Sequence, residues 1–269
     1  MSSAAAVREE MSTGRRTARP AWSGFIATTI NQLQSFYREP QALAFTIGQP
    51  FILLLILNAF NLSATLPNGE KVDYLDRLLP GMIAFSGMGV GLNSIMFPLA
   101  RYKERGTLRR IRATPMPTMS FLGGVIVSRL VIAFAVTVVT WASGVFVFGA
   151  NVHGNILLMF AVAELGAGAF IAVGLLLVAF AKSEDDLPPL FILVLMPSLL
   201  FSGAFISRAG LPEWLRWVTN GLPLTFLTNA IQDIANLGKG FTEIQGDLLG
   251  LLAWGIGASL LCGWRFKMS

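Results

Sequence analysis

Six apolar stretches of about 20 residues each, separated by polar and basic segments, constrain this chain more than any other feature of its sequence. A helix of about that length crosses the hydrocarbon core of a bilayer while satisfying its own backbone hydrogen bonds. The sequence therefore predicts an all-α membrane protein with six transmembrane helices. The predicted spans are residues 42–60, 78–99, 125–148, 156–181, 187–206 and 248–264.

The composition agrees with an exterior that faces lipid. Charged residues make up 13% of the chain and apolar residues 54%, whereas an average soluble domain carries about 25% charged residues. A soluble fold of 269 residues would have too few charges to cover its surface. The net charge of +5 does not call for nucleic acid as a partner, because membrane topology explains basic residues that lie between apolar stretches.

The Lys and Arg positions predict the orientation in the membrane, since cytoplasmic loops are enriched in these residues. A cytoplasmic N-terminus places fourteen of the 20 basic residues inside and five outside, with Arg129 within the third span. Six spans then return the C-terminus to the cytoplasm, and we expect the protein in the cell membrane. The inside set is Arg8, Arg15, Arg16, Arg19, Arg38, Arg101, Lys103, Arg105, Arg109, Arg110, Arg112, Lys182, Arg265 and Lys267. The outside set is Lys71, Arg77, Arg208, Arg216 and Lys239.

Two segments outside the spans have patterns of their own. Residues 1–20 lack the apolar run of a signal peptide, so we expect a disordered cytoplasmic tail, with residues 21–269 forming one transmembrane domain. Within residues 21–38, apolar side chains recur at helical spacing and polar side chains occupy much of the opposite side. This pattern predicts an amphipathic helix in the inner interface, the alternative being a helix that packs on a soluble partner.

The segment before the last span predicts two short helices, residues 213–219 and 224–236, each too short to cross the bilayer. Prolines mark their starts, because proline fits the first turn of a helix. We expect a re-entrant hairpin that dips into the outer leaflet and caps the exit of a pore. The predicted outer-gate residues are Trp214, Pro223 and Phe226.

Several kinds of chemistry are not expected of this chain. Cys262 is the only cysteine and His153 the only histidine, which excludes an intrachain disulfide, a CxxC site and a His-pair metal site. The pattern G-x-x-x-x-G-K-[ST] does not occur, so the chain has no P-loop for ATP. We predict neither a cofactor nor a metal in this chain.

Ionisable residues inside spans are costly and are therefore functional candidates. Arg129 lies near the inner end of its span, and we expect it to snorkel to the inner headgroups rather than to pair with Glu164, which lies nearer the outer side. For Glu164, a functional role and a structural hydrogen-bonding role remain open. The candidate polar residues of a pore are Glu164, Asn58, Asn93, Ser198 and Ser202.

Two groups of motifs resemble those of a known family. The loop after the second span reads RYKERGTLRRIRATPMP, from Arg101 to Pro117. A second group comprises Phe201-Ser-Gly, Leu211-Pro-Glu-Trp-Leu and Leu222-Pro-Leu-Thr. Together they resemble the signatures of ABC-2 type transporter permeases over about residues 21–266, closest to the daunorubicin-resistance group of drug-export permeases. The chain departs from the pattern at Ile206-Ser207, where a proline is usual, and near Gln232-Asp233, where an arginine is frequent.

The resemblance implies the pore-forming half of an ATP-driven exporter rather than an enzyme. A separate cytoplasmic ATPase subunit would bind ATP and Mg²⁺, and a second permease, identical or related, would complete the pore. The family's coupling helix, which docks on the ATPase, would correspond here to Glu104, Arg105, Gly106 and Thr107.

Three substrate classes fit this expectation: a lipophilic drug, a lipid or a glycolipid. Export of a lipid-linked polysaccharide is the main alternative, and the chain's 20 Phe against 3 Tyr favour apolar cargo. A membrane-embedded lipid-modifying enzyme is the alternative from another class, and its candidate acidic cluster is Glu184, Asp185 and Asp186. A scaffold subunit without a pore is a third.

Overall fold

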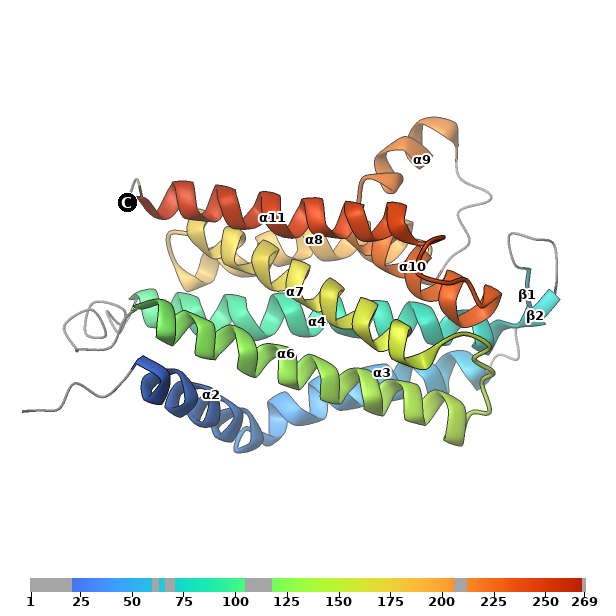
Figure 1. Cartoon of the computed structure of the whole chain (residues 1–269), viewed down its shortest axis with the longest axis horizontal. Helices are drawn as coiled ribbons and strands as arrows, with labels where there is room; N and C mark the ends of the chain where they lie inside the picture. Colours follow the sequence, from blue (N-terminus) through green and yellow to red (C-terminus); the bar gives the residue numbers. More distant parts are fainter. Residues whose placement is uncertain (1–20, 60–62, 66–70, 105–117, 206–211, 268–269) are drawn as a thin grey trace, which may run out of the picture.

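The computed structural model describes residues 21–59, 63–65, 71–104, 118–205 and 212–267 of the chain. Within them the fold is a bundle whose long helices run roughly along one axis (Figure 1). The helical elements are α2 (Ala21–Tyr37), α3 (Pro40–Ala59), α4 (Tyr74–Glu104), α6 (Thr118–Ala142), the π-helix η1 (Ser143–Val147), α7 (Ile156–Phe180), the 3₁₀-helix η2 (Glu184–Asp186), α8 (Leu187–Phe201), α9 (Glu213–Asn220), α10 (Pro223–Leu237) and α11 (Gln245–Lys267).

The middle of the bundle is built on α4 and α7. Helix α4 packs against α3, α6, α7 and α10, and α7 packs in addition against α11. Small residues permit this close approach: a Cβ atom at Gly91 of α4 would lie 2.7 Å from the Cβ of Phe170 and 2.9 Å from the carbonyl oxygen of Ala167 on α7. Glycine at such positions lets helix backbones come together without a side chain between them.

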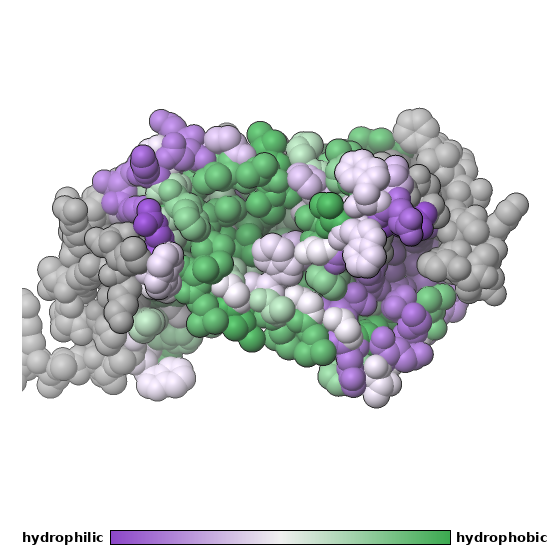
Figure 2. Space-filling model, turned by 90° about the horizontal axis from the view of Figure 1, so that it is seen from above, coloured by the Kyte–Doolittle hydropathy of each residue, from purple (hydrophilic) through white to green (hydrophobic). Residues whose placement is uncertain are grey.

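Four helices among the described residues have both the length and the apolar composition to cross a membrane. They comprise Leu75–Glu104, Met119–Val147, Ile156–Phe180 and Gln245–Arg265. The face shown in Figure 2 carries a broad hydrophobic band across its middle, with hydrophilic residues toward both ends. The expected helical, multi-pass membrane fold is therefore confirmed.

Two further helices, α3 and α8, overlap predicted spans. Helix α3 has 20 residues and α8 has 15, which correspond to lengths of about 30 Å and about 22 Å. Helix α2 covers most of the predicted amphipathic segment and packs along α6. Most of the basic loop lies in residues 105–117, outside the described part of the chain.

The described residues depart from an all-α fold at one point, a two-stranded antiparallel ribbon between α3 and α4. It pairs β1 (Ser63–Thr65) with β2 (Lys71–Asp73) in the register Ala64 opposite Val72. Figure 1 shows the ribbon beyond the helix ends. Its two strands of three residues are too short for an alternating pattern to predict them.

Candidate functional site: a polar cavity and the two ends of the bundle

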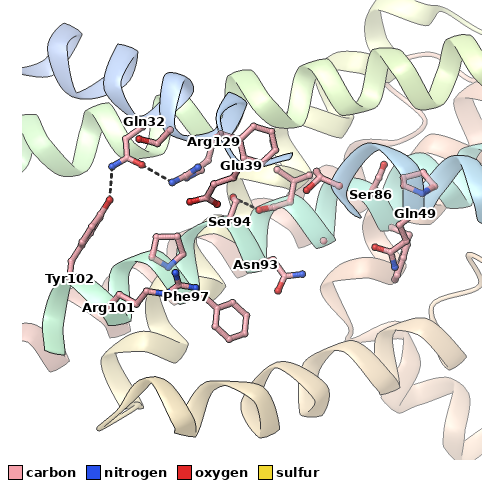
Figure 3. Close-up of a pocket in the computed structure, with 18 residues that line it drawn as sticks. Gln32, Glu39, Gln49, Ser86, Asn93, Ser94, Phe97, Arg101, Tyr102 and Arg129 are labelled. Atoms are coloured by element: carbon pink, nitrogen blue, oxygen red, sulfur yellow. Dashed lines mark hydrogen bonds between the residues drawn. The ribbon is translucent and has the colours of Figure 1, made fainter. Parts of the chain in front are cut away.

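A cavity of about 590 Å³ lies between α2, α3, α4 and α6 (Figure 3). It begins near the end of the bundle where α4 terminates, which we call the Glu104 end; we call the opposite end, where α4 begins, the Tyr74 end. The volume falls within the range of small-molecule sites. Its polar lining is Gln32, Ser35, Glu39, Thr46, Gln49, Ser86, Asn93, Ser94, Arg101, Tyr102 and Arg129. Its remaining lining is Phe36, Pro50, Phe85, Gly89, Val90, Phe97 and Pro98.

A hydrogen-bonded chain of three side chains joins three helices at this cavity. Arg129 Nη2 on α6 donates to Gln32 Oε1 on α2 at 2.8 Å, and Gln32 Nε2 donates to the Tyr102 hydroxyl on α4 at 3.0 Å. The expectation that Arg129 snorkels to the headgroups is wrong, because its side chain is only 5% exposed and ends in this network. Helix α2 covers it, so the guanidinium finds a polar partner inside the protein.

At the Glu104 end, the last turn of α4 holds the connection between α7 and α8. Arg101 Nε and Glu184 Oε1 form an ion pair at 2.8 Å, and Lys103 Nζ donates to the Ala181 carbonyl at 2.8 Å. The Glu104 carboxylate accepts a hydrogen bond from the backbone N–H of Glu184. Of the predicted coupling residues, Glu104 is thus bound to the α7–α8 connection, while Arg105, Gly106 and Thr107 lie outside the described residues.

The acidic cluster in this connection is engaged in structure. Asp186 Oδ2 accepts hydrogen bonds from the backbone N–H groups of Lys182 at 2.8 Å and Ser183 at 3.0 Å. These bonds stabilise the ionised carboxylate and hold the pKa of Asp186 below its ordinary value. With Glu184 paired to Arg101, two of the three acidic groups already have partners, which weighs against an enzymatic centre here.

The four candidate pore residues whose side chains the structure describes do not all line one cavity. Asn93 lines the polar cavity. Ser198 and Ser202 are buried: the Ser198 hydroxyl has no hydrogen-bond partner among the described residues, and Ser202 Oγ accepts from the backbone N–H of Ala204 at 3.2 Å. The side chain of Asn58 lies outside the described part.

Glu164 lies on the face of α7 that is turned toward α6. Residues one turn away on either side define that face: the Phe160 ring packs 5.9 Å from Phe134, centroid to centroid, and the space beside Gly168 is bounded by Leu130. Glu164 Oε1 is buried without a hydrogen-bond partner among the described residues. As expected, Arg129 does not supply one, because it is bonded to Gln32.

At the Tyr74 end, the two short helices differ in environment. Helix α9 follows Pro212 and lies on the outside, with Trp214 69% exposed. Helix α10 begins at Pro223 and is inserted among α4, α7 and α11 (Figure 1). Pro223 is buried, and Phe226 packs so closely against α11 that a Cβ atom at Gly250 would lie 2.5 Å from its ring. The predicted outer-gate residues are therefore divided between an exposed helix and a buried one.

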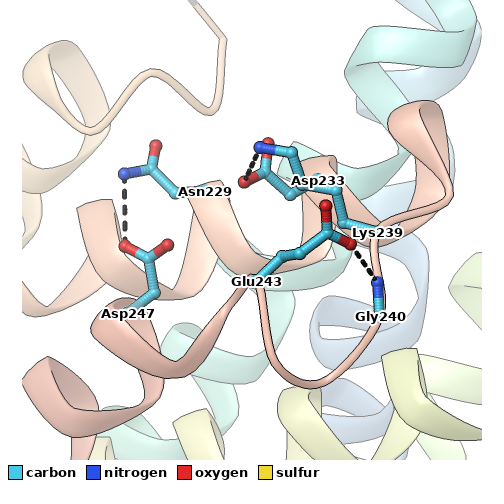
Figure 4. Close-up of polar contacts among 6 residues, drawn as sticks. All are labelled: Asn229, Asp233, Lys239, Gly240, Glu243 and Asp247. Atoms are coloured by element: carbon cyan, nitrogen blue, oxygen red, sulfur yellow. Dashed lines mark hydrogen bonds and ion pairs between the residues drawn. The ribbon is translucent and has the colours of Figure 1, made fainter.

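Polar contacts hold α10, the start of α11 and the connection between them together (Figure 4). Lys239 Nζ pairs with Asp233 Oδ2 at 2.9 Å, and Asn229 Nδ2 donates to Asp247 Oδ1 at 3.4 Å. The Gly240 N–H donates to Glu243 Oε2 at 2.8 Å. No group of three metal-binding side chains occurs among the residues that the structure describes, so these contacts are best understood as structural.

Sequence reasoning missed the main members of the cavity, above all Gln32 and Tyr102. Gln32 falls on the polar side of the amphipathic pattern in residues 21–38, a position that predicts contact with headgroups or water. The available signal was Arg129 itself: a cation within an apolar helix needs a polar partner on a neighbouring helix at the same depth. Distances along the chain of 97 and 70 residues hid these pairings from local patterns.

Comparison with known proteins places these features in a family. The family model described as ABC-2 type transporter matches residues 23–235. ABC transporter G family member 20 of Dictyostelium discoideum is 27% identical over 190 residues, which cover 70% of this chain and 26% of that protein. The inner membrane transport permease YhhJ of Escherichia coli is 27% identical over 160 residues, covering 58% of this chain and 42% of the relative.

A third relative carries a more specific name. The probable multidrug ABC transporter permease YbhR of Escherichia coli is 24% identical over 182 residues, covering 67% of this chain and 47% of its own length. The chain thus spans about half or less of the length of the curated relatives it matches. The family model covers most of the chain, including the polar cavity and most of α2 and α10, and the chain belongs to the ABC-2 type transporter family.

Proposed function

We propose that this chain is the permease subunit of an ATP-driven exporter that moves a lipophilic drug, a lipid or a glycolipid out of the cell. Family membership is the observation that carries the proposal, and the name of the relative YbhR favours multidrug export within it. The long apolar helices support a membrane path for an apolar substrate. The pairing of Glu184 and the hydrogen bonding of Asp186 leave the lipid-modifying enzyme with less support.

We infer a six-span topology with both termini in the cytoplasm. Helices α3 and α8 would add two spans to the four that meet the criteria for length and apolarity. The Glu104 end would face the cytoplasm, because Arg101, Lys103 and Lys182 gather there. The ribbon, α9 and the α10–α11 connection would then lie on the outer side.

A cytoplasmic ABC ATPase, which binds ATP and Mg²⁺, would dock at the Glu104 end. The contacts of Arg101, Lys103 and Glu104 with the α7–α8 connection support this, because a push on the end of α4 would reach α7 and α8 directly. Rigid-body motion of packed helices is a common way to open a path. Residues Glu104, Arg105, Gly106 and Thr107 would form the docking segment.

A second permease, either a copy or a related chain, would complete the pore. Exposed apolar side chains on α8 and α11, among them Leu193 and Leu260, are available to contact it or lipid. Asn58, Asn93, Glu164, Ser198 and Ser202 are proposed pore residues. Trp214, Pro223 and Phe226 are proposed to restrict the outer exit as part of a re-entrant α9–α10 hairpin.

The decisive experiment combines the purified chain with its ATPase in proteoliposomes and measures ATP turnover together with export of a fluorescent lipophilic dye. Glu104→Ala and Glu104→Gln should both lower permease-stimulated turnover, because both remove the charge that is proposed to meet the ATPase. Glu213→Ala, at an exposed acid of the Tyr74 end, is the matched control and should behave as wild type.

Glu104→Gln separates coupling from folding, since its amide oxygen still accepts the Glu184 N–H. Normal turnover and export with Glu104→Gln, together with a loss confined to Glu104→Ala, would reduce Glu104 to a structural role. The absence of any dye movement with an active ATPase would refute export of lipophilic cargo.

A further inference from the structure

Arg129 is a buried cation with hydrogen-bonding capacity that the protein does not use. Its side chain is 5% exposed, and among the described residues only Nη2 has a partner, the neutral amide of Gln32. Nε has none. A guanidinium has five N–H donors and matches the oxygens of a phosphate or a carboxylate. Its hydrogen-bond acceptor is a neutral amide, and Glu39 attracts the guanidinium only through space, so an anionic ligand in contact with it would add a charged partner.

The cavity beside Arg129 has a second charge of opposite sign. Glu39 lines it, and Figure 3 shows Glu39 and Arg129 directed into the same space from α2's end and α6. No ion pair joins them among the described residues. The other cation of the lining, Arg101, is already paired with Glu184. Glu39 and Arg129 attract each other across the cavity without direct contact, and a ligand that contacts both would carry one negative and one positive group.

The rest of the lining fits an amphiphile. Polar groups such as Asn93 and Ser94 alternate around the cavity with Phe36, Phe85 and Phe97. On the far side of α2, a separate groove lined by apolar residues of α6 also includes Phe36. Arg101 and Tyr102 place one edge of the cavity near the last turn of α4, at the Glu104 end of the bundle.

We propose that this cavity binds the phosphoethanolamine headgroup of a membrane phospholipid, with the phosphate on Arg129 and the ammonium on Glu39. The proposal concerns lipid binding and holds whether or not the chain exports lipophilic cargo. The chains of the lipid would extend along the apolar surfaces of α2 and α3, and the bound lipid would join three helices at the polar network.

The test uses the purified full-length chain and measures lipid retention by native mass spectrometry and lipid-dependent thermal stability. Phosphatidylethanolamine should be retained, and diacylglycerol of the same chain length, which lacks the phosphate, should not. Arg129→Gln should lower phosphatidylethanolamine affinity about tenfold or more. Arg216→Gln on α9 is the matched control, because Arg216 is an exposed arginine that lines neither this cavity nor the neighbouring groove.

A second variant does not touch the charged network. A Cβ atom at Gly89, which lines the cavity, would meet nothing within 4 Å, so Gly89→Leu fills the space where the lipid would lie. Gly257→Leu on α11 is its control, since a Cβ atom there also meets nothing within 4 Å but lies away from the cavity. Gly89→Leu should lose lipid retention, and Gly257→Leu should keep it.

The preference for one lipid headgroup over another provides the most discriminating test. Wild type should prefer phosphatidylethanolamine to phosphatidylglycerol, and Glu39→Gln should remove or reverse that preference by removing the carboxylate that meets the ammonium. Equal retention of diacylglycerol, undiminished binding by both Arg129→Gln and Gly89→Leu, or an unchanged preference in Glu39→Gln would overturn the proposal. A rise in thermal stability with soluble phosphoethanolamine, but not with phosphatidylethanolamine, would overturn the assignment to a lipid.

Discussion

Arg129 of α6 donates a hydrogen bond of 2.8 Å to Gln32 of α2, and both side chains are buried. The bond joins an N-terminal helix to a central span across 97 residues of sequence. It keeps α2 against the bundle through a polar contact at a position where apolar packing alone would leave a cation without a partner.

Gln32→Leu should lower the free energy of unfolding by about 1–3 kcal/mol, because it leaves the Arg129 Nη2 donor buried without an acceptor. Tyr102→Phe should cost less, about 0.5–1.5 kcal/mol, since it removes a neutral partner from Gln32. Thermal unfolding in detergent, with a double-mutant cycle between Gln32 and Arg129, measures both effects. A cycle in which the two positions act independently would contradict the network.

Gly91→Ala should destabilise the bundle by about 1–3 kcal/mol, because the added methyl group would lie 2.7 Å from the Phe170 Cβ and push α4 from α7. Gly257→Ala on α11 is the control. Its methyl group meets nothing within 4 Å, and alanine favours helix over glycine, so stability should stay constant or rise. The comparison is made by thermal unfolding, and equal behaviour of the two variants would show that α4 and α7 are not in close contact.

Asp186→Asn should reduce the loss of stability on acidification. Because backbone hydrogen bonds lower the pKa of Asp186 in the folded chain, its contribution is present above the unfolded-state pKa, about 3.9, and is lost as the pH falls through the folded value. Melting temperatures of wild type and variant between pH 7 and pH 3 provide the test. Asp185→Asn, at the neighbouring acid, is the control; if both variants show the same acid profile, the Asp186 contacts are not the cause.

Glu164→Gln should leave the melting temperature unchanged or raise it, because it replaces a carboxylate that has a buried, unpartnered oxygen by a neutral group of the same shape. Export assays on the same protein separate the two roles that Glu164 could have. A marked fall in stability would show that the carboxylate has a structural partner in the membrane.

Single cysteines at the two ends test the orientation. In a Cys262→Ala background, Thr242→Cys should react with an impermeant maleimide in intact cells, whereas Asp185→Cys should react only after the cells are permeabilised. Both positions are exposed and lie at opposite ends of the bundle. Labelling of Asp185→Cys in intact cells would reverse the proposed topology.

Apolar patterns could predict where helices lie, and less well where they end. Residues 156–181 were expected as one helix, and α7 runs Ile156–Phe180. The start is fixed by Asn155, whose side chain accepts hydrogen bonds from the N–H groups of Leu157 and Leu158. Helix α6 starts at Thr118, seven residues before the expected 125, because helical hydrogen bonding also includes residues that precede the apolar stretch.

The polar cavity and the burial of α10 could not be predicted in the same way. Both depend on which helices become neighbours, and the pairing of Gln32 with Arg129 leaves no local pattern. Helix α10 has the composition of a short amphipathic helix, yet Leu224, Leu227, Ile231 and Ile234 are fully buried. The residues that line the cavity come from four helices and the α2–α3 connection, which only the fold brings together.

The position of α10 has a consequence for how the chain is made. Helices α4 and α7 precede residues 223–237 in the chain and are therefore synthesised before them. Until then, the groove that Leu227 fills beside Gly166 has no occupant. Assembly of the central spans is therefore completed late, when α10 enters between helices already in the bilayer, and a truncation before Pro223 should leave those spans inserted but loosely packed and exposed to membrane proteases.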